Sequence, residues 1–176
     1  MNLILIGYRA TGKTTLARLL AERLGWSWVD LDEQIERAAG KPIAQIFAED
    51  GEPAFRDLES KTVKEWCGRD AVVVAAGGGA PLREENRRAM KAAGKVIWLT
   101  ASPQTIHARM QADATTAARR PALTVTGGLE EIVRLLAQRE PIYRQTADLV
   151  IDTEDRSPEW LVDELLGRLG TGEERN

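Results

Sequence analysis

The chain has one cysteine and one histidine, and it has no long apolar run. With Cys67 as the sole thiol, neither an internal disulfide nor a thiol-bound metal can form, so we expect a half-buried packing residue there. His107 lacks a cysteine, histidine or serine partner in the sequence pattern, and we assign it no role. No stretch approaches the roughly 20 apolar residues of a membrane span, and the chain begins with an apolar strand instead of a charged leader. These absences predict a cytoplasmic protein.

Basic residues are not in excess either. The 24 Lys and Arg residues against 27 Asp and Glu give a formal net charge of -3 and a pI near 5.4. Binding along a nucleic-acid backbone needs a surface dense in cations, so nucleic acid is not an expected partner. The hydrophobic share of 43%, with 29% charged residues, is typical of a soluble globular enzyme. We therefore expect no membrane or nucleic-acid partner, and we favour a monomer.

The order of apolar runs and helical patterns predicts the fold class. Short runs rich in Val and Ile alternate with helical periodicity, which is typical of an α/β fold with a parallel sheet and helices on both faces. Five strands are expected, at residues 2–6, 27–30, 71–75, 95–100 and 148–151. Helices are expected at residues 13–24, 32–39, 42–49, 52–66, 84–93, 103–111, 129–145 and 158–169.

The length of 176 residues fits one domain, and neither an internal repeat nor an interdomain linker is present. We assign residues 1–170 to this domain and residues 171–176 to a flexible polar tail. Residues 111–128 have no sustained apolar period, and loops of that length are often functional. We therefore predict a mobile lid there.

Residues 7–14 read GYRATGKT, between an apolar strand and a helical pattern, and they match the phosphate-binding loop GxxxxGK[ST] in its required context. Small residues let backbone N–H groups surround phosphate oxygens, and the following helix adds its positive dipole end. Lys13 adds a mobile charge, and the Thr14 hydroxyl is placed to ligate the nucleotide's Mg²⁺. The alternative is a plain glycine turn with a solvated lysine. We predict binding of ATP or GTP with magnesium.

Polar residues and glycines follow two other strands, and in an open α/β sheet ligands bind beyond the carboxyl ends of the strands. Asp30 could hold a magnesium-bound water, and Asp32 could accept a hydrogen bond from a substrate hydroxyl; alternatively, Asp32 only caps the next helix. Residues 77–79 are three glycines, which let a ligand approach the backbone closely.

Three arginine segments are ambiguous when each is considered singly. Arg56 and Glu59 lie three residues apart in a helix and could be a plain surface ion pair. Arg120, with Arg119 before it, lies in the predicted lid and could reach the phosphates, although exposed arginine pairs are usually just solvated. Arg139 falls late in a long helix, where a surface charge is the ordinary interpretation.

The order of these motifs resembles shikimate kinase, a family of the nucleoside-monophosphate-kinase-like group of phosphate-loop proteins. The resemblance covers nearly the whole chain and six motifs in register. These are the phosphate-binding loop, the paired aspartates, Phe55-Arg56 with Glu59, the glycine triplet, Arg120-Pro121, and Arg139 with Pro141, Tyr143 and Arg144.

The resemblance implies an ATP-dependent kinase that phosphorylates the 3-hydroxyl of shikimate, in aromatic amino acid biosynthesis. It implies catalytic roles for Lys13, Asp32 and Arg120, and magnesium ligation by Thr14 and Asp30. It implies that shikimate is held by Asp32, Arg56, Gly78 and Arg139, with ring walls from Phe47, Phe55 and Pro121. It places ATP on Ala10, Thr11, Gly12, Lys13, Thr14, Thr15, Arg120 and Arg156.

Two features depart from the family pattern. Ala75 and Ala76 precede the glycine triplet where a serine or threonine is usual, and we expect activity to survive because Thr14 and Asp30 remain. Residues 111–118 look longer than in many family lids, so we leave Arg109 out of the site.

Two alternative functions are weighed against this one. The first is a gluconate or nucleoside monophosphate kinase on the same scaffold. The second is a GTP-dependent switch, which the absence of an Asn-Lys-x-Asp guanine motif disfavours.

Overall fold

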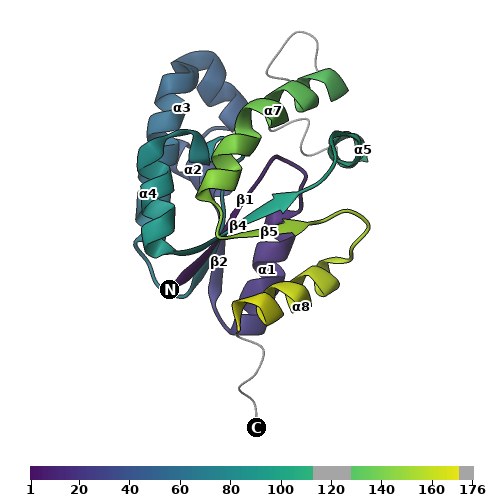
Figure 1. The fold of residues 1–176 in the computed structure, drawn as a ribbon. Coiled ribbons are helices and arrows are strands. Elements are labelled where there is room, and N and C mark those ends of the chain that lie inside the picture. The colour runs from purple at the N-terminus through teal and green to yellow at the C-terminus, as the bar shows by residue number, and fades with distance from the viewer. Residues whose placement is uncertain (113–127, 171–176) are drawn as a thin grey trace.

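The structure is a computed structural model that describes residues 1–112 and 128–170 (Figure 1). Its centre is a five-stranded parallel sheet in the order β2-β3-β1-β4-β5. The strands are β1 (Asn2–Ile6), β2 (Ser27–Asp30), β3 (Val72–Ala75), β4 (Gly94–Thr100) and β5 (Leu149–Asp152). The predicted α/β class and all five strands are confirmed, with ends that shift by one residue at β3, β4 and β5.

Helices cover both faces of this sheet, as Figure 1 shows. They are α1 (Lys13–Leu24), α2 (Leu31–Ala39), α3 (Ile43–Cys67), α4 (Glu84–Ala93), α5 (Pro103–Ala112), α7 (Leu129–Thr146) and α8 (Pro158–Leu169), with a 3₁₀ turn η1 (Ala80–Leu82). One core joins α1 and α8 to Leu3 and Leu5, and another joins α3, α4 and α7 to Ile4 and Ile6. Successive side chains of a strand point to opposite faces of the sheet, which is why β1 contributes to both cores. Because helices cover both faces, all five residues of β1 are buried.

The long helix α3 replaces two predicted helices. Gly51 interrupts it with φ 82° and ψ 168°, a conformation that only glycine adopts without strain, so two helical segments meet there across a kink. Pro53 follows in the first turn of the second segment, where its missing N–H costs no helical hydrogen bond. The predicted break was therefore in the right place.

Two other expectations change with the structure. Cys67 is buried rather than half-buried, and this burial raises the pKa of its thiol to about 11. Gln111 and Ala112 belong to α5, so the predicted lid does not begin at 111. The rest of the predicted lid and the predicted tail, residues 113–127 and 171–176, lie outside the described residues. Within residues 1–112 and 128–170, no helix is both long and apolar enough to cross a bilayer.

Candidate active site

The phosphate-binding loop joins β1 to α1 through backbone conformations that its glycines permit. Gly7 has φ 141°, and a Cβ there would lie 2.5 Å from the carbonyl oxygen of Leu99 on β4. Gly12 has φ 91°, and Ala10 has φ 60°, a left-handed conformation that is strained for a residue with a side chain. Backbone strain of this kind is concentrated at functional sites, where the surrounding structure maintains it.

Lys13 lies against this loop. Its Nζ donates to the carbonyl oxygens of Gly7 (2.9 Å) and Tyr8 (2.7 Å), and the hydroxyl of Thr11 also donates to Tyr8 O (2.8 Å). Both of these acceptors are backbone carbonyls of the loop, so the contacts hold the ammonium against it. The loop therefore carries a positive charge at the start of a helix, a combination that attracts phosphate.

Asp30 connects the loop to β2. Its Oδ2 accepts a hydrogen bond from the Thr14 hydroxyl (2.5 Å), and its Oδ1 accepts from the backbone N–H groups of Asp32 (3.0 Å) and Glu33 (3.4 Å). Asp30 is therefore the N-cap of α2. The alternative that Asp32 caps this helix is wrong, because Asp32 already lies in its first turn.

The Thr14–Asp30 pair fits a magnesium site completed by a nucleotide. Burial, and then the negative charge of Asp32, raise the pKa of Asp30 above its ordinary value, and a nearby cation would oppose both effects. Among the described residues, no group of three or more His, Cys, Asp or Glu side chains could hold a metal alone. One hydroxyl and one carboxylate, with phosphates and waters as further ligands, is the usual arrangement for Mg²⁺.

Two arginines from different helices meet at the glycine triplet after β3. A Cβ on Gly78 would lie 3.5 Å from Nη1 of Arg139 and 3.4 Å from the carbonyl oxygen of Gly7. A Cβ on Gly79 would lie 2.2 Å from Nη1 of Arg56, which is closer than atoms can approach. The absence of side chains at Gly78 and Gly79 thus lets α3, α7 and the phosphate-binding loop approach one another. A turn with larger residues at these positions would keep them apart.

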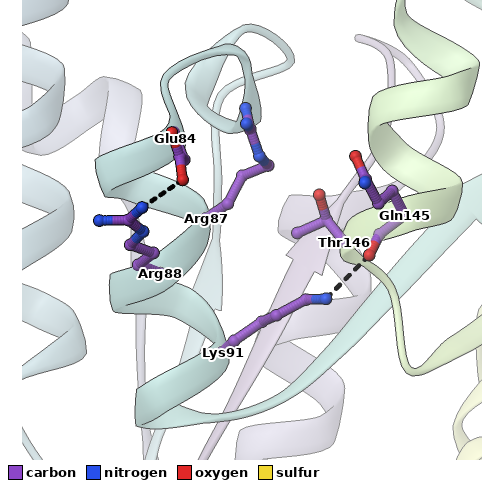
Figure 2. A pocket seen from close by; sticks show the side chains of 6 residues that line it. All are labelled: Glu84, Arg87, Arg88, Lys91, Gln145 and Thr146. Carbon is purple, nitrogen blue, oxygen red and sulfur yellow. Dashed lines mark hydrogen bonds and ion pairs between the residues drawn. The ribbon is translucent and has the colours of Figure 1, made fainter.

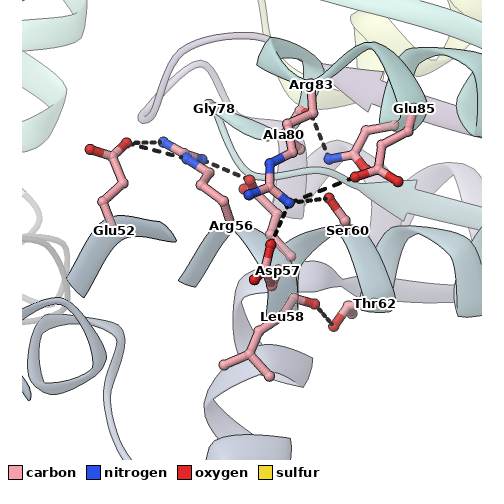
Figure 3. Close-up of polar contacts among 12 residues, drawn as sticks. Glu52, Arg56, Asp57, Leu58, Ser60, Thr62, Gly78, Ala80, Arg83 and Glu85 are labelled. Atoms are coloured by element: carbon pink, nitrogen blue, oxygen red, sulfur yellow. Dashed lines mark hydrogen bonds and ion pairs between the residues drawn. The ribbon is translucent and has the colours of Figure 1, made fainter. Parts of the chain in front are cut away.

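Arg56 is held by two carboxylates of its own helix, of which Figure 3 labels Glu52. Its Nη1 donates to Glu59 (2.7 Å), and its Nε and Nη2 donate to Glu52 (3.3 Å each). The Glu59 side chain is 1% exposed, so the interpretation of Arg56–Glu59 as a plain surface ion pair is wrong. A buried carboxylate that binds one end of the guanidinium fixes its position near the triplet.

Arg139 is also buried, although a position late in a helix predicted a surface charge. Its guanidinium lies 5.6 Å from the ring centroid of Tyr8, within the range of a cation–π contact. Tyr8 belongs to the phosphate-binding loop, so Arg139 contacts that loop and the triplet together.

Sequence reasoning missed the role of Tyr143. Its buried hydroxyl donates to the carbonyl oxygen of Gly78 (2.5 Å), and its ring packs 5.8 Å from that of Trp98. Tyr143 thereby fixes the middle of the triplet from α7, one turn after Arg139. The spacing Arg-x-x-x-Tyr, which puts both side chains on one helix face, was the available signal.

Arg109 was set aside on the sequence, yet the structure places it beside the loop. Its Nη1 donates to Ala10 O (3.3 Å) and Thr153 Oγ1 (3.0 Å), and its Nη2 donates to Thr153 O (2.9 Å). Arg109 therefore connects the phosphate-binding loop to the segment after β5. Arg156 lies in that segment, with its guanidinium 4.6 Å from the ring centroid of Trp160.

The remaining predicted residues divide between described and undescribed parts of the chain. Phe47 and Phe55 stack with ring centroids 4.7 Å apart, next to Arg56, which lies 5.2 Å over the Phe55 ring. Arg120 and Pro121 lie outside the described residues.

A pocket of about 220 Å³ lies between α4 and α7, and none of the predicted site residues lines it (Figure 2). Its cations already have partners: Arg87 donates to Pro81 O and Leu82 O, Lys91 donates to Gln145 O, and Arg88 pairs with Glu84. These contacts tie η1, which follows the triplet, and the end of α7 to α4. The residues that line the pocket therefore hold η1 and α7 against α4, and none of them is a predicted ligand-binding residue.

This edge of the sheet supports the transfer of a phosphoryl group to a small anionic acceptor. The protein is a P-loop phosphotransferase of the nucleoside-monophosphate-kinase-like group. A sequence profile of the shikimate kinase family matches residues 9–170. The chain belongs to the shikimate kinase family, whose activity is ATP-dependent phosphorylation of shikimate.

Individual relatives are similar over nearly the full length of the chain. A shikimate kinase of Rhodopirellula baltica is 47% identical over 94% of this chain and 88% of its own. One of Symbiobacterium thermophilum is 42% identical over 99% of both chains. The solved structure of a shikimate kinase from Acinetobacter baumannii, in complex with shikimate, matches with a TM-score of 0.90 at 33% identity and covers 99% of this chain and 95% of that one.

Proposed function

We propose that this chain transfers the γ-phosphate of ATP to the 3-hydroxyl of shikimate, giving ADP and shikimate 3-phosphate. The observation that carries the proposal is the convergence of Arg56 and Arg139 on a glycine triplet whose middle residue lies against the phosphate-binding loop. A planar guanidinium binds a carboxylate with two parallel hydrogen bonds, so two of them suit a small acid. Gly78 lets that acid approach the backbone beside the triphosphate.

We assign the nucleotide to Ala10, Thr11, Gly12, Lys13, Thr14 and Thr15, with Arg156 near the adenine and Arg120 near the phosphates. Lys13 would leave the carbonyls of Gly7 and Tyr8 for phosphate oxygens, since a charged acceptor makes the stronger hydrogen bond. Thr14, and Asp30 through a water, would hold Mg²⁺, which when bound neutralises the phosphate charge. Because both residues are in place, Ala75 and Ala76 before the triplet need not abolish activity.

Asp32 is the proposed acceptor for the hydroxyl proton of shikimate. It lies in the first turn of α2, close enough to Asp30 for their charges to interact. Phosphoryl transfer asks the protein mainly to align the attacking oxygen and to stabilise charge, so Asp32 would chiefly orient the hydroxyl. A cytoplasmic monomer remains the prediction from the sequence.

Arg56→Lys is expected to raise the KM for shikimate about 10-fold, the loss of roughly one charge-assisted hydrogen bond. A lysine ammonium is a point charge and cannot reproduce the planar fork. Steady-state kinetics with varied shikimate and then varied ATP measure the effect, which should be confined to shikimate. Arg83→Lys is the matched control, because Arg83 pairs with exposed Asp57 and not with the triplet. An unchanged KM would show that Arg56 does not bind the carboxylate.

An acceptor panel tests the function itself. ADP release is measured with ATP and, in turn, shikimate, quinate, gluconate, AMP or no acceptor. The proposal predicts rapid release with shikimate and little with the others. Turnover that prefers gluconate or AMP would favour the alternative kinases, and acceptor-independent GTP hydrolysis would favour a switch protein.

A further inference from the structure

The two carboxylates on Arg56 differ in burial and in the quality of their contacts. Glu59 is 1% exposed and accepts from Nη1 at 2.7 Å, whereas Glu52 is 62% exposed and accepts from both Nε and Nη2 at 3.3 Å with a single oxygen. A short bond to a buried partner is strong, and a long shared bond at the surface is weak. Glu59 is therefore the permanent partner of Arg56, and Glu52 is easily displaced.

Glu52 also occupies a specific edge of the guanidinium. Nε and Nη2 together form one of the edges that bind a carboxylate with two parallel bonds. A substrate carboxylate can take this edge only after Glu52 has left it. Figure 3 shows Glu52 beyond the end of the Arg56 side chain, on the side opposite the labelled residues of η1 and α4.

The kink in α3 accounts for the position of Glu52. Gly51 ends the first helical segment, and Glu52 opens the second, four residues before Arg56 and thus on the same face. A glutamate in the first turn also suits the helix dipole. Such a pair could be a simple helix-stabilising contact, but here its cation is the one proposed to bind the substrate.

We propose that the Glu52 carboxylate occupies the binding position of the substrate carboxylate on the Nε–Nη2 edge of Arg56 in the free enzyme. Shikimate must displace Glu52 from this edge in order to bind. This inference rests on the proposed function, in which Arg56 binds that carboxylate. Glu52 keeps Arg56 aligned in the free enzyme and weakens the binding of carboxylate ligands by competition. Because of this competition, Glu52 affects the KM for shikimate and does not affect the phosphoryl-transfer step.

Glu52→Gln tests this inference, because glutamine keeps an acceptor oxygen near Arg56 but removes the competing charge. The variant should lower the KM for shikimate about 3- to 5-fold with kcat unchanged, as expected from the loss of an exposed ion pair at the upper end of the usual range. Asp57→Asn is the matched control: it removes one exposed charge from the same helix, but Asp57 pairs with Arg83. It should leave the KM unchanged.

A neutral substrate separates competition from general electrostatics. The carboxamide of shikimate presents no charge to Arg56, so Glu52→Gln should raise kcat/KM for shikimate and leave kcat/KM for the carboxamide within twofold. An equal gain with both substrates, an equal effect of Asp57→Asn, or a raised KM for shikimate would overturn the inference. The proposed function has its own criterion: it fails if Arg56→Lys leaves the KM for shikimate unchanged, whatever Glu52→Gln does.

Discussion

Lys13→Met is expected to lower kcat by about 10²- to 10³-fold, the effect of removing one group that stabilises charge in a transition state. In the structure, the Lys13 ammonium lies at the phosphate-binding loop, where it donates to the carbonyl oxygens of Gly7 and Tyr8 and can exchange them for a phosphate oxygen. Methionine keeps the length of the side chain but has no charge. The measurement is kcat for ADP release at saturating shikimate and ATP.

Lys64→Met is the control for this variant. Lys64 is exposed and pairs with Glu85 on α4, so its replacement should leave kcat unchanged. Thermal unfolding of both variants checks that the fold is intact. Turnover of Lys13→Met equal to that of the wild type would refute the charge-stabilising role of Lys13.

Gly79→Ala is expected to raise the KM for shikimate about 10- to 100-fold while the protein stays folded. The new Cβ would lie 2.2 Å from Nη1 and 2.5 Å from Nη2 of Arg56, so the guanidinium must move away from the triplet. The backbone of Gly79 has φ -94° and ψ -8°, which alanine adopts without strain. The guanidinium that must yield is the end of a flexible side chain, but it pairs with buried Glu59, so the cost to folding should be about 1–3 kcal/mol.

The expected rise in KM reflects the loss of the hydrogen bonds between the Arg56 guanidinium and the shikimate carboxylate, which are worth roughly 1.5–3 kcal/mol. Kinetics with varied shikimate measure the KM, and chemical denaturation measures the free energy of unfolding. Gly167→Ala in α8 is the control, because a Cβ there meets nothing within 4 Å and alanine favours a helix. A normal KM in Gly79→Ala would mean that the position of Arg56 near the triplet is not the one that binds substrate.

The sheet could be predicted from the sequence because each strand is a short apolar run with a clear boundary. β1 and β2 were predicted to the residue, since Gly7 follows β1, Gly25 lies just before β2, and Asp30 caps the helix that follows β2. The kink of α3 was also foreseen at Gly51, although as a gap between two helices. Local chemistry determines all of these features.

The site was less predictable, because its residues meet through tertiary packing. Considered by its position in the sequence, Arg139 is expected at the surface of its helix. Only the packing of α7 against the phosphate-binding loop shows that it is buried. Which aspartate caps α2 depends on where the helix begins, and because it begins at Leu31, the cap is Asp30 and not Asp32. Arg109 reaches Ala10 across 99 positions of sequence, and nothing local indicates that contact.

The central claim is that one edge of the sheet holds a triphosphate in the loop and aims it at an acid bound by two arginines. A crystal structure with a non-hydrolysable ATP analogue, Mg²⁺ and shikimate tests it most directly. It should show Lys13 Nζ on a phosphate oxygen in place of Gly7 O and Tyr8 O, with the substrate carboxylate between Arg56 and Arg139. An analogue bound outside residues 7–14, or both guanidinium groups turned to bulk solvent, would contradict it.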